Sequence, residues 1–378
     1  MSLSKSRFIE MFGNPNTNSL NLPEKPIKNV CQNLDYKREP ITSSERVKGK
    51  YPYYGASGIV DWVDNFIFDD DLLLVSEDGE NLSARVTPIA FSIKGKTWVN
   101  NHAHVLKFDD LYMQNYVEYF FNQLDLTSKI TGTAQPKFNQ KALNETMLPI
   151  PSIESLVHFK NLCNQIDKSK FLLQKILEKL ELLKKSRFIE MFGSTDLSLQ
   201  KDDWVEIKNI GEVVSGSTPK TTNESYWGGE NKWITPAELS SDTYVITKTY
   251  RYLTDEGVKS CSLRKLPKDT VLLTSRAPIG KVAIAGTEMY CNQGFKNIIC
   301  NEKVRPKYLF YLLKNNVRYL EYLGRGATFK EISKSIVENV KIPLFPIQEQ
   351  DRFIEFAEQI DKSKLVIQKS LEDLVGKS

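Results

Sequence analysis

The chain has 378 residues, of which 40% are hydrophobic, 26% charged and 11% aromatic. This balance is typical of a soluble globular protein, and the length predicts two or three domains. The formal net charge is +4, from 51 basic and 47 acidic residues. That excess is too small to indicate a nucleic-acid-binding protein by itself, so any basic surface must come from segregated charges.

Cysteine and hydrophobicity patterns exclude further classes. The five cysteines are odd in number and include no C-x-x-C pair, which argues against a disulfide framework or a zinc site and favours a reducing compartment. No apolar run approaches the ~18 residues of a membrane span. The first residues, MSLSKSRFIEMFG, lack the apolar core of a signal peptide. We therefore expect a cytoplasmic protein with no membrane segment.

The chain before residue 153 predicts a short helix followed by a mixed domain. Residues 1–13 form an amphipathic helical pattern, which the Asn14-Pro15-Asn16 turn ends. Residues 14–152 alternate short apolar runs with Asp, Gly and Pro turns, as in a compact α/β domain. The expected strands cover residues 66–68, 72–75, 89–93 and 98–99, and the expected helix covers 113–124.

Residues 153–193 predict one long helix, because the stretch contains no Pro and no Gly before Gly193. About forty residues at ~1.5 Å each give a rod of roughly 60 Å. Two apolar seams repeat every seven residues, a pattern typical of a coiled coil. The first seam is Phe159, Ile166, Leu173 and Leu180, and the second is Leu162, Ile176 and Leu183, interrupted at Ser169 and Glu190. A single amphipathic helix on a globular core is the alternative.

Residues 194–346 repeat the plan of the first domain, and residues 347–378 add a last helix. Pro343 and Pro346 separate the second domain from that helix. The expected elements are strands over 271–274 and 282–285 and a helix over 306–323.

The helical stretch occurs twice. The sequence FKNLCNQIDKSKFLLQKILEKL, which begins at Phe159, recurs from Phe353 as FIEFAEQIDKSKLVIQKSLEDL. The sequence KSRFIEMFG at Lys185–Gly193 recurs unchanged at Lys5–Gly13. One copy is therefore whole and central, and the other is divided between the two ends of the chain. This arrangement predicts an α+β fold in which a pseudo-two-fold, antiparallel two-helix coiled coil separates two mixed α/β domains.

The two domains also align with each other. The matched stretches are Ile27–Val30 with Ile207–Ile210, Leu73–Ser76 with Leu272–Ser275, Asn100 with Asn292, Gly132 with Gly326, and Leu148-Pro149 with Ile342-Pro343. Any one match can arise by chance, but their shared order indicates that the domains are diverged copies.

Several longer motifs lie in the helices, in the first domain and in the second domain. They are QIDKSK at 165–170 and 359–364, YPYYGASGIVDW at 51–62, SEDG at 76–79, NNHAHVL at 100–106, GTAQPKFNQKAL at 132–143, SGSTPKT at 215–221, WITP at 233–236, LLTSRAPIGKVAI at 272–284 and GRGATFKEI at 324–332. With the split repeat, they make the chain resemble, over essentially its whole length, the specificity (S) subunit of type I restriction-modification enzymes.

The resemblance implies a function for each part. The two α/β domains would be target-recognition domains, each reading one half of a bipartite site in double-stranded DNA. The helices would space these domains and dock two methyltransferase (M) subunits. An M subunit would flip and methylate an adenine with S-adenosylmethionine, and a restriction (R) subunit would join through the complex and cut with ATP.

Polar, aromatic and basic side chains near glycine turns are the candidate DNA contacts, because such groups bind phosphates and base edges. In the first domain they are Lys48, Tyr53, Tyr54, Ser57, Asn101, His102, His104, Gln135 and Lys137. In the second they are Ser217, Thr218, Lys220, Trp233, Arg276, Asn292, Gln293, Lys296, Arg325, Thr328 and Lys330. Ordinary polar turns, core tyrosines and arginine–carboxylate pairs are the alternatives that the sequence leaves open. The His-x-His pair lacks a third ligand at a sensible spacing, so no metal is expected.

A repeated polar face of the helices is the candidate docking surface for M subunits, because these residues are mostly off the seams. They are Lys168, Lys170, Gln174, Lys175 and Glu178 in the central helix and Lys362, Lys364, Gln368, Lys369 and Glu372 in the last helix. A solvated face is the alternative.

Catalytic motifs are missing from the sequence. It contains neither the Asn/Asp-Pro-Pro-aromatic tetrad of amino-methyltransferases nor a G-x-x-x-x-G-K-[ST] loop. Asp196 followed by Glu206-Ile207-Lys208 matches a metal-dependent nuclease motif only loosely. We expect a non-enzymatic DNA-recognition subunit that holds no cofactor. A coiled-coil scaffold whose two domains bind protein or glycan is the rival, favoured by the near-neutral charge and disfavoured by the split repeat.

Overall fold

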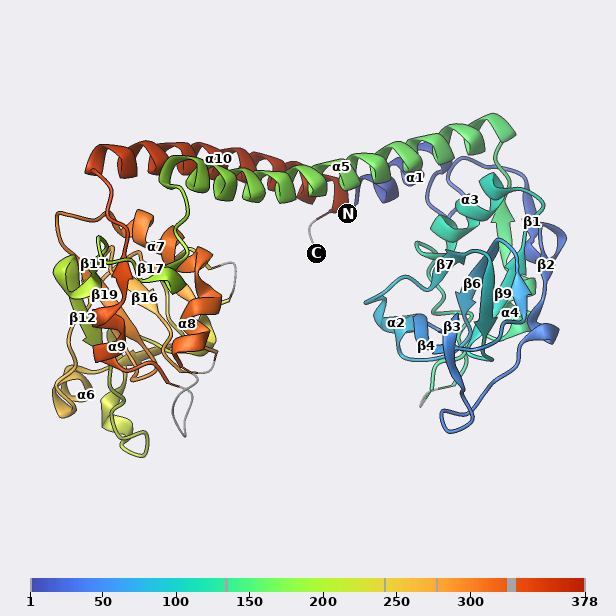
Figure 1. Cartoon of the computed structure of the whole chain (residues 1–378). Helices are drawn as coiled ribbons and strands as arrows, with labels where there is room; N and C mark the ends of the chain where they lie inside the picture. The colour runs from blue at the N-terminus through green and yellow to red at the C-terminus, as the bar shows by residue number, and fades with distance from the viewer. Residues whose placement is uncertain (1, 133–134, 241–242, 277, 325–330, 377–378) are drawn as a thin grey trace. The chain divides into compact units, whose positions relative to one another are not determined.

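A computed structural model describes residues 2–132, 135–240, 243–276, 278–324 and 331–376. The chain divides into two compact units, residues 1–175 with 367–378 and residues 176–366. The division falls within two long helices, α5 (Ile153–Phe192) and α10 (Ile347–Val375), so each unit contains part of both. Both units carry a mixed α/β domain (Figure 1), which confirms the predicted α+β class.

Unit 1 is built on two four-stranded sheets, in the orders β2-β9-β6-β7 and β4-β3-β8-β5, and on a short β1-β10 pair. Its strands are β1 (Glu24–Pro26), β2 (Gln32–Asn33), β3 (Lys48–Gly55), β4 (Gly58–Val63), β5 (Phe68–Asp69), β6 (Leu72–Ser76), β7 (Ala90–Ile93), β8 (Lys96–Val99), β9 (Ala103–Lys107) and β10 (Met147–Pro149). Its helices besides α5 and α10 are α1 (Leu3–Phe12), α2 (Asn81–Ala84), α3 (Leu111–Phe121), α4 (Gln140–Asn144) and the 3-10 turns η1 (Ile27–Asn29) and η2 (Asp35–Lys37).

Unit 2 contains a five-stranded sheet in the order β12-β19-β16-β17-β14, a three-stranded sheet in the order β15-β13-β18 and the pair β11-β20. Its strands are β11 (Val205–Glu206), β12 (Gly211–Ser215), β13 (Trp227–Ile234), β14 (Val245–Ile246), β15 (Arg251–Leu253), β16 (Val271–Leu273), β17 (Val282–Ala285), β18 (Tyr290–Cys291), β19 (Lys296–Cys300) and β20 (Lys341–Ile342). Its further helices are α6 (Asp255–Ser260), α7 (Pro306–Asn315), α8 (Val317–Leu323), α9 (Lys334–Asn339) and the 3-10 turns η3 (Leu197–Leu199), η4 (Ile207–Asn209), η5 (Glu224–Tyr226) and η6 (Pro236–Glu238).

The central strands were predictable because they are apolar without alternation. Every residue of β6 and β16 is buried, as expected for strands covered on both faces. The β3–β4 hairpin and β13 were not predicted. Both carry Gly, Tyr or Trp among polar residues and are partly exposed, so they lack the clear alternation that marks a half-buried strand.

An aromatic cluster joins the helices of unit 1 to its sheet. Phe8 and Phe12 of α1 contact Phe159 of α5 edge to face, with ring centroids 5.6 and 5.2 Å apart. Tyr116 of α3 stacks on Phe8 at 5.4 Å and donates its hydroxyl to the Pro149 carbonyl at 2.8 Å. The repeated KSRFIEMFG stretch therefore supplies two core residues to this cluster.

Unit 2 contains the same cluster built from the other copies of these residues. Phe188 and Phe192 of α5 contact Phe353 of α10 at 5.0 and 5.7 Å. Tyr308 of α7 stacks on Phe188 at 5.7 Å and donates to the Pro343 carbonyl at 2.9 Å. The matching contacts confirm that the two units are built on one plan.

The long helices pack along a seam that differs from the predicted one. The buried residues of α5 include Phe159, Cys163 and Ile166 in unit 1 and Lys184 and Phe188 in unit 2, which follow steps of three and four residues. The second predicted seam was wrong by one position, since Ile176 is 42% and Leu183 47% exposed. None of the helices in the described part of the chain is long and apolar enough to cross a membrane.

Two lysines of the predicted docking face, Lys170 and Lys364, lie on this seam instead. Lys364 pairs with Glu181 across the two helices of unit 2, and Lys184 pairs with Asp361 at 2.7 Å. Because the partner numbers fall in one helix as they rise in the other, the helices of unit 2 are antiparallel. Lys170, the repeat equivalent of Lys364, is also largely covered, with 26% of its side chain exposed.

The predicted helix over 306–323 is two helices, α7 and α8, separated at Asn316. The buried Asn316 side chain donates to the carbonyls of Thr195 and Leu312 and accepts from the Leu197 amide at 2.9 Å. These bonds connect the segment after α5 to the point where α7 ends and α8 begins. An asparagine can make all of them, because its side chain has both a donor and an acceptor.

Candidate nucleic-acid interface

Four loops of each unit meet at one edge of its sheets, and we call this the four-loop edge. In unit 1 the loops are A (residues 34–47), B (77–80), C (100–102) and D (130–139), of which residues 133–134 lie outside the described residues. In unit 2 they are A (216–226), B (274–281), C (292–295) and D (324–333), of which residues 277 and 325–330 lie outside the described residues. Most of the predicted DNA-binding residues lie on these loops or on the adjoining β3 and β13 strands.

Backbone hydrogen bonds fix the correspondence between the two edges. Glu77 donates its amide to the His102 carbonyl and accepts from the Phe138 amide, at 2.9 and 2.7 Å. Ser275 makes the same two bonds, with Gly294 and Ile332, at 2.7 and 2.9 Å. Glu77 is therefore equivalent to Ser275, and the predicted alignment of Leu73–Ser76 with Leu272–Ser275 was wrong by one residue.

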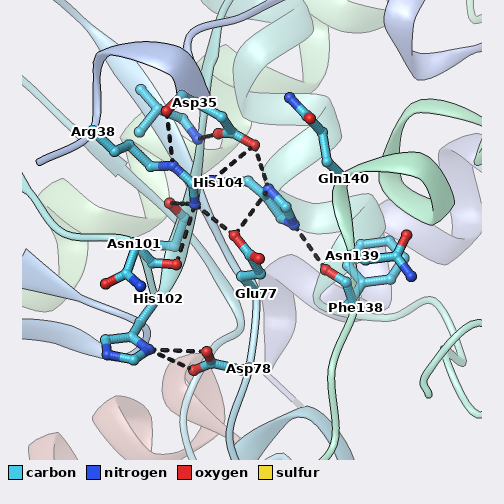
Figure 2. A network of polar contacts seen from close by, with 12 residues as sticks. Asp35, Arg38, Glu77, Asp78, Asn101, His102, His104, Phe138, Asn139 and Gln140 are labelled. Carbon is cyan, nitrogen blue, oxygen red and sulfur yellow. Dashed lines mark hydrogen bonds and ion pairs between the residues drawn. The ribbon is translucent and has the colours of Figure 1, made fainter. Parts of the chain in front are cut away.

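Arg38 joins three loops of unit 1 (Figure 2). Its guanidinium donates to the Glu77 carboxylate at 2.6 Å and to the carbonyls of Asn101 and Ala103 at 3.4 and 2.9 Å. It also contacts Asp35 at 3.4 Å. Only 13% of the Arg38 side chain is exposed, so a single cation in a largely dry site fixes loops A, B and C to one another.

His104 of β9 joins the same network to loop D. Its Nδ1 lies 2.6 Å from the Asp35 carboxylate, and its Nε2 lies 2.7 Å from the Phe138 carbonyl (Figure 2). The carbonyl and the carboxylate are both hydrogen-bond acceptors, so His104 bridges Asp35 of loop A and Phe138 of loop D. His102, two residues before it, instead binds Asp78 at 2.9 Å.

The two carboxylates of the network are ionised at neutral pH. Burial raises the pKa of Asp35, but hydrogen bonds from His104 and the Val105 amide and the nearby Arg38 charge outweigh it and hold that pKa below its usual value. Burial likewise raises the pKa of Glu77, and Arg38, His104 and Lys137 bring it below the usual value. Buried carboxylates of this kind are tolerated because cations surround them.

Asp35, Glu77 and His104 also have the ligand types of a metal site, and their ligand atoms lie within 4.8 Å of one another. The sequence shows no third ligand at a sensible spacing from the His-x-His pair, and Asp35 and Glu77 approach His104 from distant positions in the chain. The Arg38 guanidinium and the Lys137 ammonium, however, already contact these carboxylates. The cluster thus fits an internally neutralised ion network better than a metal centre.

Loop D of unit 1 closes on itself above this network. Thr131 and Lys137 exchange two backbone hydrogen bonds of 2.9 and 2.8 Å, and the Lys137 ammonium lies 3.2 Å from Glu77. Gly132 has φ +86°, and a Cβ there would approach the Gln135 carbonyl to 2.6 Å. Glycine is therefore required at this turn.

Loop A of unit 1 is held by aromatic side chains from below. The Tyr53 hydroxyl accepts from the Ile41 amide at 3.0 Å, and the Trp98 indole donates to the Glu39 carbonyl at 2.6 Å. Arg46 covers the Tyr53 ring at 4.4 Å from its centroid. Tyr53 is 1% exposed, so it supports the loop and does not face solvent.

Unit 2 holds its loop A in the same manner with tryptophans. The Trp233 indole donates to the Ser217 carbonyl at 3.1 Å, and the Trp227 indole donates to the Lys220 carbonyl at 3.4 Å. Arg251 lies over the Trp227 ring at 3.5 Å. Two indoles and one guanidinium thus fix the SGSTPKT loop.

The base of loop D in unit 2 is bound by Lys296 of β19. Its ammonium contacts Glu331 at 3.2 Å and the Ser275 hydroxyl at 3.3 Å, and 8% of its side chain is exposed. Arg276 approaches the other oxygen of Glu331 at 3.0 Å. Burial raises the pKa of Glu331, but Lys296 and Arg276 together bring it below its usual value.

The predicted contact residues divide by exposure. Lys48, Ser57, Asn101, His102, Gln135, Lys137, Lys220, Arg276 and Gln293 are exposed, and Tyr54, Ser217, Thr218 and Asn292 are half-buried. The buried Tyr53, His104, Trp233 and Lys296 were wrongly predicted to face DNA; their side chains support the loops instead. Arg325, Thr328 and Lys330 lie outside the described residues.

Sequence reasoning missed the residues that bind the loops together. These are Asp35, Arg38, Glu77, Arg46 and Trp98 in unit 1 and Trp227, Arg251 and Glu331 in unit 2. The signal available in the sequence was the position of charged residues next to apolar strands, such as Glu77 directly after β6, because a charge there must find a partner on folding.

Comparison with known families decides which kind of interface this is. The type I restriction modification DNA specificity domain matches residues 22–186 and again residues 201–375. The chain belongs to this family. The two matches together cover most of the sequence and fall on the two repeats, so both α/β domains are DNA specificity domains.

Individual relatives agree with the family. Over 173 residues, the chain is 45% identical to the MjaIX specificity subunit of Methanocaldococcus jannaschii, a match covering 44% of this chain and 40% of that protein. It is 22% identical over 348 residues to the putative subunit S.HindORF215P of Haemophilus influenzae, covering 89% and 87%. A chain solved in a study of complex assembly and conformational transition of the type I R-M system shares the fold, with TM-score 0.59, 16% identity and coverage of 93% and 94%.

Proposed function

We propose that this chain is the cytoplasmic DNA-specificity subunit of a type I restriction-modification complex and that each four-loop edge reads one half of a bipartite duplex site. The observation that carries the proposal is the same four-loop edge in both specificity domains. Its exposed hydroxyl, amide, imidazole and basic groups suit phosphates and base edges. Loops on a rigid scaffold are also where recognition residues concentrate.

The test is to identify the methylated sites that appear when the chain is expressed with its M subunit. Exchange of residues 14–152 for the equivalent segment of another family member is expected to change one half of the site and leave the other. A change in both halves, or in neither, would contradict the assignment of one half-site to each domain.

Exposed apolar pairs on the helices are the proposed docking surface for two M subunits. Phe171 and Leu172 of α5 are 58% and 48% exposed, and Leu365 and Val366, at the same positions of the repeat in α10, are 66% and 67% exposed. Clustered exposed apolar residues mark surfaces that a partner covers. Two equivalent pairs fit two copies of one partner.

The predicted polar docking residues flank these pairs. Those exposed to solvent are Lys168, Gln174, Lys175, Glu178, Lys362, Gln368, Lys369 and Glu372, whereas Lys170 and Lys364 lie on the helix seam. The variant Phe171→Glu/Leu365→Glu is expected to lose co-purification of the M subunit. Val86→Glu is the matched control, because Val86 is 84% exposed and is not part of α5 or α10. Retention of the M subunit by the double variant would exclude these pairs as the docking surface.

The length of the helices is proposed to set the unread spacer between the half-sites. Insertion of one heptad after Lys170 and one after Lys364 keeps the seam in register. It adds ~10 Å of helix, which at ~3.4 Å per base pair is at most about three base pairs. Methylation mapping should show unchanged half-sites with a longer spacer. An unchanged spacer in an active complex would refute the role of the helices as a ruler.

The isolated chain is proposed to have no methyltransferase, nuclease or ATPase turnover. The missing catalytic motifs support this, and the family is one of specificity domains. Methyl transfer to DNA by the purified chain, with M subunit contamination excluded, would show that it carries a catalytic site.

A further inference from the structure

The base of loop D is bound by a buried nitrogen-bearing side chain at the same position in both units. His104 and Lys296 each lead from loop C into the strand next to β6 or β16 and occupy equivalent places. His104 is 0% and Lys296 6% exposed. His104 binds the Phe138 carbonyl, and Lys296 binds Glu331. Neither side chain can contact DNA, because both are buried. Each instead binds the base of loop D, the end at which the loop joins the sheet.

The other loops also contact these two buried side chains. His104 faces Asp35 and Glu77, which in turn contact Arg38 and Lys137. These groups come from loops A, B and D, so movement of His104 is coupled to all of them.

Lys296 contacts loops B and D of unit 2 as His104 does in unit 1, and it contacts loop C where His104 contacts loop A. It contacts Ser275 of loop B at 3.3 Å, the Gln293 carbonyl of loop C at 3.5 Å and Glu331 of loop D at 3.2 Å. Arg276 lies on the far side of Glu331. Both units therefore place a buried hydrogen-bonding side chain at the junction of the loops, an imidazole in unit 1 and an ammonium in unit 2.

We propose that His104 and Lys296 are positioning residues for DNA readout, each fixing the described base of loop D in its own unit, at Phe138 and Glu331, and thereby the base preference of one half-site. The inference rests on the proposed function, because it assumes that the four-loop edges read DNA. It goes further because it assigns the base preference at each half-site to one buried side chain that does not contact the DNA.

The test compares two neutral variants in the complex with the M subunit. In His104→Gln the side-chain amide takes the place of Nε2 and can still donate to the Phe138 carbonyl. In His104→Asn the amide takes the place of Nδ1 and leaves that carbonyl unpaired. Base preference at each half-site is read by sequencing the sites methylated in a randomised duplex pool.

His104→Asn is expected to relax the half-site of unit 1 by about tenfold or more, the effect of leaving one buried carbonyl unpaired, and to leave the other half-site unchanged. His104→Gln should retain most of the preference. Lys296→Gln should relax only the other half-site.

A measurement without DNA separates this inference from the proposed function. Amide hydrogen exchange over residues 135–138 of the full chain should be faster in His104→Asn than in His104→Gln, with the other strands of unit 1 unchanged. Equal exchange in the two variants would overturn the anchoring role. Faster exchange with unchanged base preference, in a complex that still selects its site, would overturn the role in readout. Failure of the parent complex to select any site would count against the proposed function instead.

Discussion

The two four-loop edges share a backbone plan but hold it with different charges. Loop D carries Lys137 in unit 1 and Glu331 at the equivalent bridge in unit 2. Lys137 pairs with Glu77, and Glu331 pairs with Arg276 and Lys296. The loop residue is thus a cation in one unit and an anion in the other, and in both it is neutralised by the residues beneath it.

The comparison separates what the fold requires from what it leaves free. The backbone bonds made by Glu77 and Ser275 are the same, because they close the loop on the sheet. The side chains need only balance one another, since a buried charge is costly when it is unpaired and tolerated when it is paired. A domain in which every buried charge stays paired can therefore change the charges that face a ligand without changing its backbone.

The helix junctions show a similar contrast. In unit 2 the buried Lys184 bridges Asp361 at 2.7 Å and Glu181 at 3.2 Å and lies 5.7 Å from the Tyr311 ring. The repeat equivalent of Lys184 in unit 1 is Ser4, which is also buried. One junction therefore contains an ion pair across helices where the other contains a small hydroxyl.

The largest expected effect breaks what the two units have in common. Phe188→Ala and Phe8→Ala each remove a fully buried ring from equivalent aromatic clusters. Each should lower the free energy of unfolding of its own unit by about 3–5 kcal/mol. Urea unfolding followed by peptide-resolved hydrogen exchange reports the two units separately. A loss confined to one variant would show that the clusters are not energetically equivalent.

The next effect sharpens the difference between the junctions. Lys184→Ser gives unit 2 the residue found in unit 1 and leaves Asp361 unpaired. We expect a loss of about 1–3 kcal/mol, below the usual cost of breaking a fully buried pair because Asp361 is one-third exposed. Lys184→Met with Asp361→Leu should recover most of it. Ser4→Ala is the comparison variant: it removes a buried hydroxyl that lies 3.3 Å from the Ser2 hydroxyl and should cost about 1 kcal/mol or less. A double variant no more stable than Lys184→Ser would argue against the ion pair as the cause.

The helices and the repeat were predictable because their signals are local. The run without Pro or Gly and the doubled sequence located α5 and α10, whose bounds follow from residues adjacent in the chain. The second seam was placed one residue off, because Leu162, Ile176 and Leu183 are apolar although solvent faces two of them, while the seam itself contains Lys170, Lys184 and Lys364. Apolar type alone does not distinguish a helix contact from a surface that a partner covers.

The candidate site was predictable only in its loops. Glycine turns and polar motifs located the loops, because such residues break regular structure. The burial of His104 and Lys296 was not predictable, since it depends on Asp35, Glu77 and Glu331, which are distant in the sequence and meet only in the folded sheet. A titratable side chain looks the same in the sequence whether it faces a ligand or supports a loop.

A third variant exchanges the charges between the units. Glu331→Lys places a third cation beside Arg276 and Lys296 and should loosen loop D of unit 2. Arg276→Asp together with Glu331→Lys recreates the charge order of Asp78 and Lys137 in unit 1 and should recover part of the loss. We expect an effect of about 1 kcal/mol, because the pair is partly exposed. Exchange rates around Ile332 provide the measurement. Equal exchange in the single and double variants would show that the pair acts independently.

The smallest effect is an acid sensitivity that differs between the units. The folded-state pKa values of Asp35, Glu77 and Glu331 are all below their usual values. A carboxyl with a lowered pKa stabilises the fold above its unfolded pKa, and this contribution is lost as the pH falls through the lowered value. The loss should therefore begin only below the usual carboxyl pKa of about 4.

Unit 1 should respond more strongly, because it has two such carboxyls with 4% and 11% of their side chains exposed, whereas 29% of Glu331 is exposed. Protonation of Asp35 removes the acceptor of His104, and protonation of Glu77 removes that of Arg38. Amide exchange at Phe138 and Ile332 between pH 5 and pH 3, corrected for the intrinsic exchange rate, should accelerate first at Phe138. Earlier acceleration at Ile332 would mean that the exposed pair, and not the buried network, is the weaker anchor.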